Sequence, residues 1–395
     1  MNSKDIYDII IENAIKDWEK TMNNQNRGEI WAIDPRYSKS EINKAGSIIA
    51  NSSSSKEECE NALIIVNNWR ASHIYPLRII YNNLQKENPD AIVVQRLKRL
   101  ESIIGKLELN PNMKLYRMQD LGGCRVIVDT IYQVYEAVNR YKKSCISHIL
   151  KNEKDYIQTP KESGYRSYHM IYQFQNDEYE IYNKNMLIEI QFRTKLQQIW
   201  ATAIEMMGIY TGSNLKSGQG EQNILRFFTL VSSLFAIREN MPVCPYTSEW
   251  ADELITEIMQ IEGRSNIIMK LKAINQAVQT TDYNKNFHLR NGYYLLILNY
   301  DEPSLNIYPY KQSDFELAVN SYNKIESEFV GAMDAVLVSV KSFETLKIAY
   351  PNYFIDISEF LDILRTIMLN YSHYNKNAKI FLESNYILED SIPMG

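Results

Sequence analysis

The segment MLIEIQFRT, residues 186–194, holds the side chains best suited to chemistry, because its polar and apolar residues alternate. In an extended strand, Glu189, Gln191 and Arg193 line one face, and the apolar residues between them face a core. A carboxylate, an amide and a guanidinium in one row suit a site that binds phosphates and a metal ion. The same alternation is equally typical of a strand with one face open to solvent. Neighbouring segments must therefore decide between the two interpretations.

The segment DYIQTPKESGYRSYH, residues 155–169, carries a second chemical signal. Pro160 and Gly164 predict a turn, and glycine accepts a positive φ without strain. Tyr165 and His169 follow the turn at a spacing of four. A tyrosine ring held by a rigid turn can stack on a nucleobase, although tyrosine more often has a packing role. This segment favours a nucleotide site over a solvated strand face.

A second carboxylate, Asp120, ends the MQD that precedes the strand-like LGGCRVIV, five residues before Arg125. Together with Glu189 from another strand, it would place two carboxylates at one end of a sheet. Such a pair can hold Mg²⁺, which prefers hard oxygen ligands and shares them with substrate phosphates. Either acid alone is more often a surface charge or a helix cap.

A basic cluster lies upstream and contains Arg96, Lys98, Arg99 and Lys106, with Ser102 among them. If Ser102 caps the helix that begins there, the helix end adds backbone N–H donors for a phosphate. Arginine gives bidentate phosphate contacts, and lysine gives a point charge. Taken alone, a basic stretch of this kind is usually a solvated face.

The elements that must position these residues alternate between helices and strands. Helices dominate before residue 90, where the apolar runs IYDIIIENAI and NALIIVNNW are separated by a polar loop around Ser52–Glu58. Pro76 predicts a bend between two consecutive helices. Strand-like alternation begins at Ile92, where a helix remains the alternative, and β-branched residues predict a buried strand at Cys124–Asp129. Further helices are expected over 101–109, 131–141, 195–207 and 224–237. The order predicts an α/β fold with a mixed sheet between helices.

A second small α/β unit is expected after PVCPYTSE, which marks a domain boundary near residue 245. The turn at Asp301–Ser304 predicts a hairpin between the first two strands of this unit. Its expected elements are a helix over 249–278, strands at 293–300 and 305–310, a helix from 315, a strand at 335–340 and a helix near 360–369. None of these elements carries a catalytic signal.

Composition limits the classes of function. The 395 residues, 45% of them hydrophobic, are enough for two domains with buried cores. No signal-peptide pattern is present, and polar residues interrupt each apolar run before it could cross a bilayer. The net charge of −5 argues against nonspecific DNA binding, and four scattered cysteines argue against a zinc site or disulfides. We therefore expect a cytoplasmic protein with no DNA or membrane partner.

Four motifs in order, RLKRLESIIGK, MQDLGGCRV, DYIQTPKESGYRSYH and IEIQFRT, resemble the synthetase domain of the RelA/SpoT family of nucleotide pyrophosphokinases. The resemblance covers roughly Asn61–Tyr210. It implies a nucleotidyltransferase-like mixed sheet, with ATP as the donor and Mg²⁺ as the cofactor. The implied reaction moves the β,γ-pyrophosphate of ATP onto a ribose 3′-hydroxyl.

The resemblance also assigns roles residue by residue. Asp120 would hold Mg²⁺, and Glu189 would assist the metal or take the proton of the acceptor. Tyr165 would stack on the acceptor base. The residues implied around ATP are Arg96, Lys98, Ser102, Lys106 and Arg125. The residues implied around the phosphates and sugar of the acceptor are His169, Gln191 and Arg193.

The resemblance divides the chain into a helical extension (1–60), a synthetase domain (61–244) and a C-terminal α/β domain (245–395). No histidine is followed by aspartate, so the His-Asp hydrolase signature of the family is missing and a synthetase without hydrolase activity is implied. Three functions stay open. The first is synthesis of the alarmone (p)ppGpp from GDP or GTP, or of a related adenosine product. The second is a toxin that pyrophosphorylates the 3′ end of tRNA, restrained by an antitoxin or by its own C-terminal domain. The third is an inactive nucleotide-binding regulator.

Overall fold

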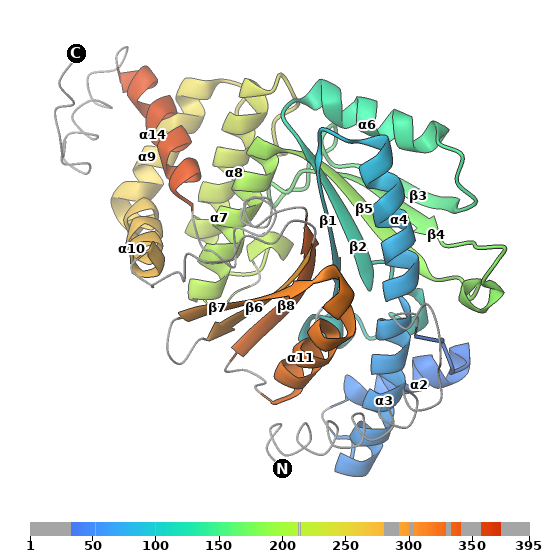
Figure 1. Cartoon of the computed structure of the whole chain (residues 1–395). Coiled ribbons are helices and arrows are strands. Elements are labelled where there is room, and N and C mark those ends of the chain that lie inside the picture. Colours follow the sequence, from blue (N-terminus) through green and yellow to red (C-terminus); the bar gives the residue numbers. More distant parts are fainter. Residues whose placement is uncertain are drawn as a thin grey trace.

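A computed structural model describes residues 33–279 except 52, 99, 212 and 214, together with residues 292–299, 304–328, 333–340 and 357–372 (Figure 1). The described strands are β1 (Ile92–Leu97), β2 (Gly122–Val128), β3 (Ile149–Asp155), β4 (Tyr168–Gln173), β5 (Leu187–Thr194), β6 (Gly292–Asn299), β7 (Ser304–Lys311) and β8 (Met333–Val340). They form one sheet in the order β3-β4-β5-β2-β1-β8-β6-β7.

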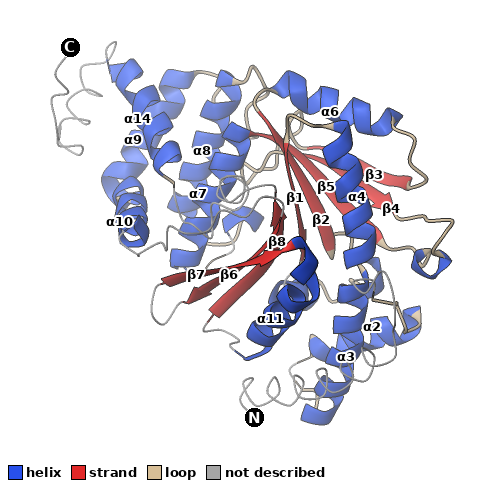
Figure 2. Ribbon diagram, viewed as in Figure 1, coloured by secondary structure: helices blue, strands red, loops and turns tan. Residues whose placement is uncertain are grey.

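The sheet is mixed, because β2 and β5 run parallel while β1 is antiparallel to β2 and β4 is antiparallel to β5. Figure 2 shows the strands between helices. The expected α/β class, with a mixed sheet flanked by helices, is confirmed. The strand expected from Ile92 is β1, so its alternating pattern was the correct guide.

One face of the sheet is covered by α4 (Ile74–Glu87) and α6 (Ile131–Lys143), and α2 (Lys39–Ile49) and α3 (Lys56–Ser72) extend this layer. Ile188, Ile190 and Phe192 of β5 are fully buried in its core. The bend expected near Pro76 is confirmed, because α3 ends at Ser72 and Pro76 lies in the first turn of α4. The predicted helix that includes IYDIIIENAI lies outside the described residues.

A second helical layer packs against β2 and β5 from the other side and consists of α7 (Lys195–Thr211) and α8 (Gln222–Arg238). The helices α9 (Ala251–Ser265), α10 (Ile267–Gln279) and α14 (Ser358–Ser372) join its core, in which Phe228 of α8 stacks on Phe360 of α14. The single helix expected over residues 249–278 was wrong. Asn266 adopts a left-handed conformation with φ of 50° and ends α9 there.

The C-terminal strands continue the sheet. β6 and β7 form the expected hairpin, β6 also pairs with β8, and β8 pairs with β1 at Gln95 and Ser339. The helix α11 (Phe315–Glu328) adds a contact, since Arg70 of α3 donates a hydrogen bond to the Tyr322 hydroxyl. The predicted boundary near residue 245 therefore falls inside a continuous sheet and a continuous helical core, and the domain limits stay a prediction.

Two strands were missed by sequence reasoning, β3 and β4, which flank the turn predicted at Pro160 and Gly164. β4 is buried on nearly all its residues, whereas β3 is an exposed edge strand rich in charged residues. The remaining described helices are α5 (Leu100–Leu109) and the short 3-10 helices η1 (Leu115–Arg117), η2 (Glu180–Tyr182), η3 (Leu215–Ser217) and η4 (Gln312–Asp314). Within the described ranges, no helix has the length and apolar character needed to cross a bilayer.

Candidate active site

The polar side chains of the central strands gather on the face of the sheet that α7 covers. Strand register sets two rows across this face, because side chains paired in register point to the same side. The first row is Arg96 on β1, Gly123 on β2 and Glu189 on β5. The second row is Arg125 on β2, Gln191 on β5 and His169 on β4. The predicted phosphate-binding and acceptor-binding residues therefore meet on adjacent strands.

Gly123 leaves open space at the centre of the first row. Among the described residues, a Cβ added there would have only the Glu189 carbonyl oxygen within 4 Å, at 3.7 Å. No long side chain from β2 therefore fills the gap between Arg96 and Glu189. A ligand group can approach the strand backbone at this point.

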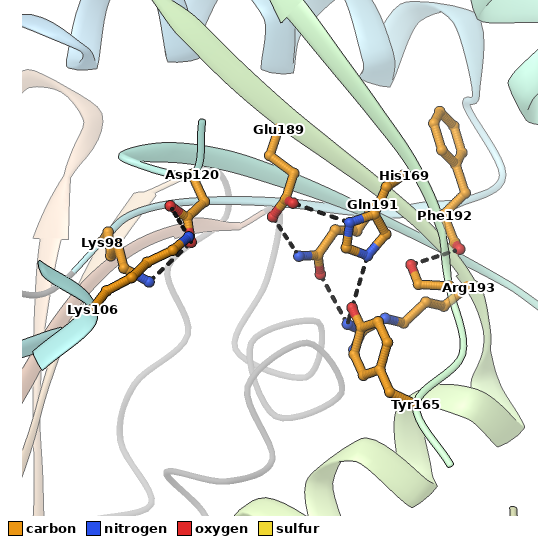
Figure 3. A network of polar contacts seen from close by, with 10 residues as sticks. Lys98, Lys106, Asp120, Tyr165, His169, Glu189, Gln191, Phe192 and Arg193 are labelled. Atoms are coloured by element: carbon orange, nitrogen blue, oxygen red, sulfur yellow. Dashed lines mark hydrogen bonds and ion pairs between the residues drawn. The ribbon is translucent and has the colours of Figure 1, made fainter. Parts of the chain in front are cut away.

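Glu189 belongs to a closed ring of hydrogen bonds (Figure 3). Its Oε1 lies 3.0 Å from His169 Nδ1, and its Oε2 accepts a hydrogen bond from Gln191 Nε2 at 2.7 Å. Arg193 Nη2 donates to Gln191 Oε1 at 2.9 Å and also to the Tyr165 hydroxyl. The hydroxyl lies 2.8 Å from His169 Nε2 and closes the ring. Each of these five side chains is held by two others of the set.

The donor directions in this ring lead toward Glu189. Glu189 can only accept, so His169 Nδ1 carries a hydrogen. Gln191 donates to Glu189 and accepts from Arg193, and the Tyr165 hydroxyl also accepts from Arg193.

Asp120 lies two residues before β2 and is held by two ammonium groups. Lys98 Nζ lies 3.0 Å from Oδ2, and Lys106 Nζ lies 3.0 and 2.9 Å from the two carboxylate oxygens. Burial alone would raise the pKa of Asp120, but the two lysines outweigh it and hold that pKa below its usual value. The Asp120 side chain is 21% exposed and that of Lys98 is 14% exposed, so the cluster borders solvent.

The two carboxylates are close enough to influence each other. Burial and the negative charge of Asp120 both act to raise the pKa of Glu189, yet the contacts with His169 and Gln191 keep that pKa below its usual value. Both acids therefore stay ionised at neutral pH. Two carboxylates fit Mg²⁺ if phosphate oxygens supply further ligands. Such ligands are needed, because no cluster of three or more His, Cys, Asp or Glu suited to a metal exists in the described part of the chain.

Tyr165 departs from the expectation of an open stacking surface, because the residue is only 6% exposed. Three cations surround its ring: Arg193 at 5.0 Å, Lys161 at 5.2 Å and Lys216 at 5.8 Å from the centroid. Gly164, at φ of 87°, forms the expected turn, and a Cβ there would lie 2.8 Å from Trp200. A base can stack on Tyr165 only if a lysine moves aside, so the stacking role stays a prediction.

One expectation needs correction. Ser102 is not a helix cap, because α5 begins at Leu100 and Ser102 lies in its first turn. The Arg193 side chain belongs to the hydrogen-bonded ring and the residue is 1% exposed, so its predicted place beside the phosphates and sugar of the acceptor stays a prediction. Arg193 is the second-last residue of β5, and α7 follows β5 directly. Arg99 lies outside the described residues.

Sequence reasoning missed Glu205 of α7 and Lys216 of η3, which form an ion pair beside Tyr165. Glu205 lies within an amphipathic helix that was interpreted only as a packing element. Lys216 lies in the glycine-containing segment between the helices predicted over 195–207 and 224–237. The two residues lie on different elements, so no local pattern indicated the pair.

Comparison with known proteins identifies the segment that carries the site. Residues 95–214 match the family model described as the region found in RelA / SpoT proteins. The chain is 35% identical over 129 residues to the GTP pyrophosphokinase YwaC of Bacillus subtilis, covering 31% of this chain and 60% of that protein. It is 35% identical over 133 residues to YjbM of the same organism, covering 32% and 60%. The matched region thus spans about three fifths of each relative.

Solved structures give weaker likenesses. Small alarmone synthetase 1 from Bacillus subtilis, bound to its product pppGpp, has a TM-score of 0.37 at 21% identity and covers 44% of this chain and 93% of that one. A GTP pyrophosphokinase family protein from Streptococcus pneumoniae has a TM-score of 0.35 at 26% identity and covers 46% and 90%. The fold assignment rests on the strand order of this chain, and residues 95–214 match the region found in RelA / SpoT proteins.

Proposed function

We propose that the protein is an ATP-dependent pyrophosphokinase that transfers the β,γ-pyrophosphate of ATP to the 3′-hydroxyl of a guanosine nucleotide. The observation that carries this proposal is the meeting of two ionised carboxylates, Asp120 and Glu189, with basic side chains on adjacent strands. Relatives that match this region are named GTP pyrophosphokinases. A location in the cytoplasm remains part of the proposal.

The cluster around Asp120 supports binding of the donor triphosphate. Lys98 and Lys106 both contact Asp120. Both lysines have flexible stems and can exchange the carboxylate for phosphate oxygens. Asp120 would then be free to hold Mg²⁺, whose other ligands would come from the phosphates. Arg96 and Arg125 face the same side of the sheet and would add charge neutralisation.

The ring around Glu189 supports orientation of the acceptor. Because Gln191, His169 and Arg193 are tied to one another, the Glu189 carboxylate is fixed before any substrate arrives. Its lowered pKa makes it a weak base and a good ligand for a cation. Phosphoryl transfer through a loose transition state needs little base assistance, so a weak proton acceptor suffices.

The proposed reaction keeps atoms and charges balanced. The 3′-oxygen of the acceptor forms a bond to the β-phosphorus of ATP, and the bond from that phosphorus to the α,β-bridging oxygen breaks. AMP leaves with this oxygen, and the proton of the acceptor hydroxyl passes to Glu189 or to solvent. When bound, Mg²⁺ would neutralise phosphate charge. The protein supplies in-line positioning and positive charge, which dominate catalysis of this reaction class.

An acceptor panel tests the proposal. Purified full-length protein is incubated with Mg²⁺, γ-labelled ATP and, in separate reactions, GDP, GTP, GMP, ATP or deacylated tRNA. We expect label on GDP or GTP. Label on tRNA alone would refute the guanosine nucleotide as acceptor and support the toxin-like activity. Nucleotide binding by calorimetry without label on any acceptor would support an inactive regulator instead.

Glu189→Gln tests the site itself. The substitution keeps the size of the side chain but removes the charge, and we expect transfer to fall about 10²- to 10⁴-fold. Glu257→Gln is the matched control, because Glu257 pairs with Arg226 between α8 and α9, at 2.6 Å. Full activity of Glu189→Gln would contradict the site assignment. A similar loss in the control would indicate a general effect on folding.

A further inference from the structure

The ion pair between Glu205 and Lys216 lies beside the site, on elements that are not part of the sheet. The Lys216 ammonium contacts Glu205 Oε1, and the two side chains are 21% and 31% exposed. Lys216 also lies 5.8 Å from the centroid of the Tyr165 ring. The Lys216 carbonyl oxygen accepts a hydrogen bond from Ser163 Oγ at 3.3 Å, in the turn that delivers Tyr165. The pair therefore lies where the turn before Tyr165, α7 and η3 meet.

Backbone contacts fix the loop that carries Lys216. Ser213 N donates to the Gly208 carbonyl oxygen at 2.8 Å, and Gly218 N donates to the Leu215 carbonyl oxygen at 2.9 Å. The Leu215 side chain is buried next to Lys216. A Cβ at Gly208 would lie 2.7 Å from the Ser213 carbonyl oxygen, so the loop approaches α7 as closely as glycine permits. Lys216 is thus held near Tyr165 by the fold of its loop.

The charges around this pair do not balance. Arg125 and Arg193 both act electrostatically on Lys216, and Arg96 and Arg125 act on Glu205. Lys161 adds another cation beside the Tyr165 ring. Burial and these cations lower the pKa of Lys216 to about 7, in spite of Glu205. An ion pair that served only to join α7 to the loop would not need so many cations near it, whereas a bound polyanion would neutralise them.

We propose that Lys216 binds a phosphate group of the nucleotide substrate at this site and that Glu205 positions its ammonium group until the substrate arrives. The inference rests on the proposed function, because that function supplies the phosphates. On binding, Lys216 donates hydrogen bonds to a phosphate oxygen, and Glu205 remains beside Arg96 and Arg125. The phosphate belongs to the acceptor or to the transferred pyrophosphate, and both sources present the same chemistry.

Calorimetry on the full-length Lys216→Met variant tests the inference and separates the two sources. The ligands are GDP, guanosine, the ATP analogue AMPCPP, adenosine and inorganic pyrophosphate. A lost hydrogen bond to a charged group lowers affinity about 10- to 150-fold. We expect a loss of this size for pyrophosphate and for at least one nucleotide, with nucleoside affinity unchanged. Among the two nucleotides, a loss for GDP but not for AMPCPP assigns the bound phosphate to the acceptor. A loss for AMPCPP but not for GDP assigns it to the donor.

Arg226→Met is the matched control, since it also removes one cation from an ion pair, between α8 and α9. Unchanged pyrophosphate and nucleotide affinities in Lys216→Met would overturn the proposal. An equal loss for nucleosides and nucleotides would overturn it as well, because that result indicates a structural role. If wild-type protein transfers pyrophosphate while Lys216→Met binds phosphates normally, only this inference fails. If wild-type protein transfers nothing but Lys216→Met loses pyrophosphate binding, the proposed function fails and the anion site stands.

Glu205→Gln gives a second, independent readout if Lys216→Met does not fold. Phosphate affinity that depends on the Lys216 ammonium falls as pH rises through the pKa of Lys216, which is about 7 in the wild type. Removing the attraction of Glu205 lowers that pKa further, so we expect this fall at lower pH in Glu205→Gln. The phosphate ligand itself titrates, so each phosphate affinity is compared with that of Arg226→Met at the same pH. Identical pH profiles in Glu205→Gln and the control would contradict the positioning role.

Discussion

Asp120 and Glu189 are two carboxylates on the same face of the sheet, but they are held in different ways. Asp120 contacts two ammonium groups on long stems, Lys98 and Lys106, at the border with solvent. Glu189 contacts an imidazole and an amide, and the buried guanidinium of Arg193 holds that amide from the other side. The first arrangement can exchange partners, and the second cannot do so without breaking several hydrogen bonds.

This difference suggests a division of labour. A triphosphate brings large negative charge, so its binding residues must accept it by exchanging an internal anion for an external one. An acceptor hydroxyl brings no charge and must be placed accurately, which requires groups fixed in advance. The exchangeable cluster lies at β1, α5 and the start of β2, and the fixed ring lies at β4 and β5. Four experiments test this division, in addition to the loss expected for Glu189→Gln.

Among these four experiments, removing the charge of Asp120 is expected to have the largest effect. Asp120→Asn retains the shape of the side chain but weakens its ability to hold a metal, and we expect kcat to fall about 10²- to 10³-fold. Single-turnover rates at saturating ATP and Mg²⁺ measure this loss. Asp129→Asn is the control, because Asp129 pairs with Lys195 at the exposed end of β2. Activity within a factor of two or so of the control would refute a metal-binding role for Asp120.

Substitution of Lys98 or Lys106 should change KM for ATP, whereas substitution within the ring around Glu189 should change kcat/KM for the acceptor. Lys98→Met and Lys106→Met each remove a charged donor, and we expect KM for ATP to rise about 10- to 150-fold. The larger change is expected for Lys98, because its side chain is 14% exposed against 34% for Lys106. Lys195→Met serves as the control. A change in acceptor KM alone would show that these lysines do not bind the donor.

Breaking the ring at one hydrogen-bonding group should have a moderate effect. Tyr165→Phe removes the hydroxyl that links Arg193 to His169 but keeps the aromatic ring. A typical intramolecular hydrogen bond contributes about 0.5–1.5 kcal/mol, so we expect a roughly 2- to 13-fold fall in kcat/KM for the acceptor. KM for ATP should stay unchanged. A change confined to KM for ATP would show that the ring around Glu189 acts on the donor and not on the acceptor.

Titration of stability should give the smallest signal. Since the pKa of Asp120 in the folded protein lies below its usual value of 3.8, its ion pairs contribute stability above pH 3.8. That contribution disappears as pH falls through the folded value. The free energies of unfolding of wild type and Asp120→Asn should therefore differ near neutral pH and converge in acid. Urea unfolding between pH 7 and the lowest pH at which both proteins fold measures this, and a constant difference would contradict the pairing.

Sequence patterns predicted the parts of this site that lie within single segments. The alternation in MLIEIQFRT placed Glu189 and Gln191 on one face, and the order of the motifs indicated that Asp120 and Lys98 belong near them. β3 escaped prediction because charged residues dominate it, and β4 because it directly follows a turn and its burial depends on partners distant in the sequence. Local patterns contain no information about such partners.

The same limit explains which features of the site sequence patterns did not predict. Burial of Tyr165 and Arg193 depends on the packing of α7 and the loop after it, which no alternation records. The break at Asn266 depends on one residue that tolerates a left-handed conformation inside an otherwise continuous helical pattern. Residue types thus identified the chemistry of the site, and long-range packing decided which side chains are accessible.

The pairing of β8 with β1 has a consequence for synthesis of the chain on the ribosome. β1 gains its first neighbour, β2, within about thirty residues, but β8 begins at Met333, long after β5 ends at Thr194. At a translation rate of about 5–20 residues per second, the edge of β1 stays unpaired on the order of ten seconds after β5 emerges. During that interval β1, which contains Arg96, has an open strand edge, and such an edge can pair with other nascent chains. Slow codons or a chaperone between residues 195 and 333 would therefore change the yield of this protein more than the same features placed later.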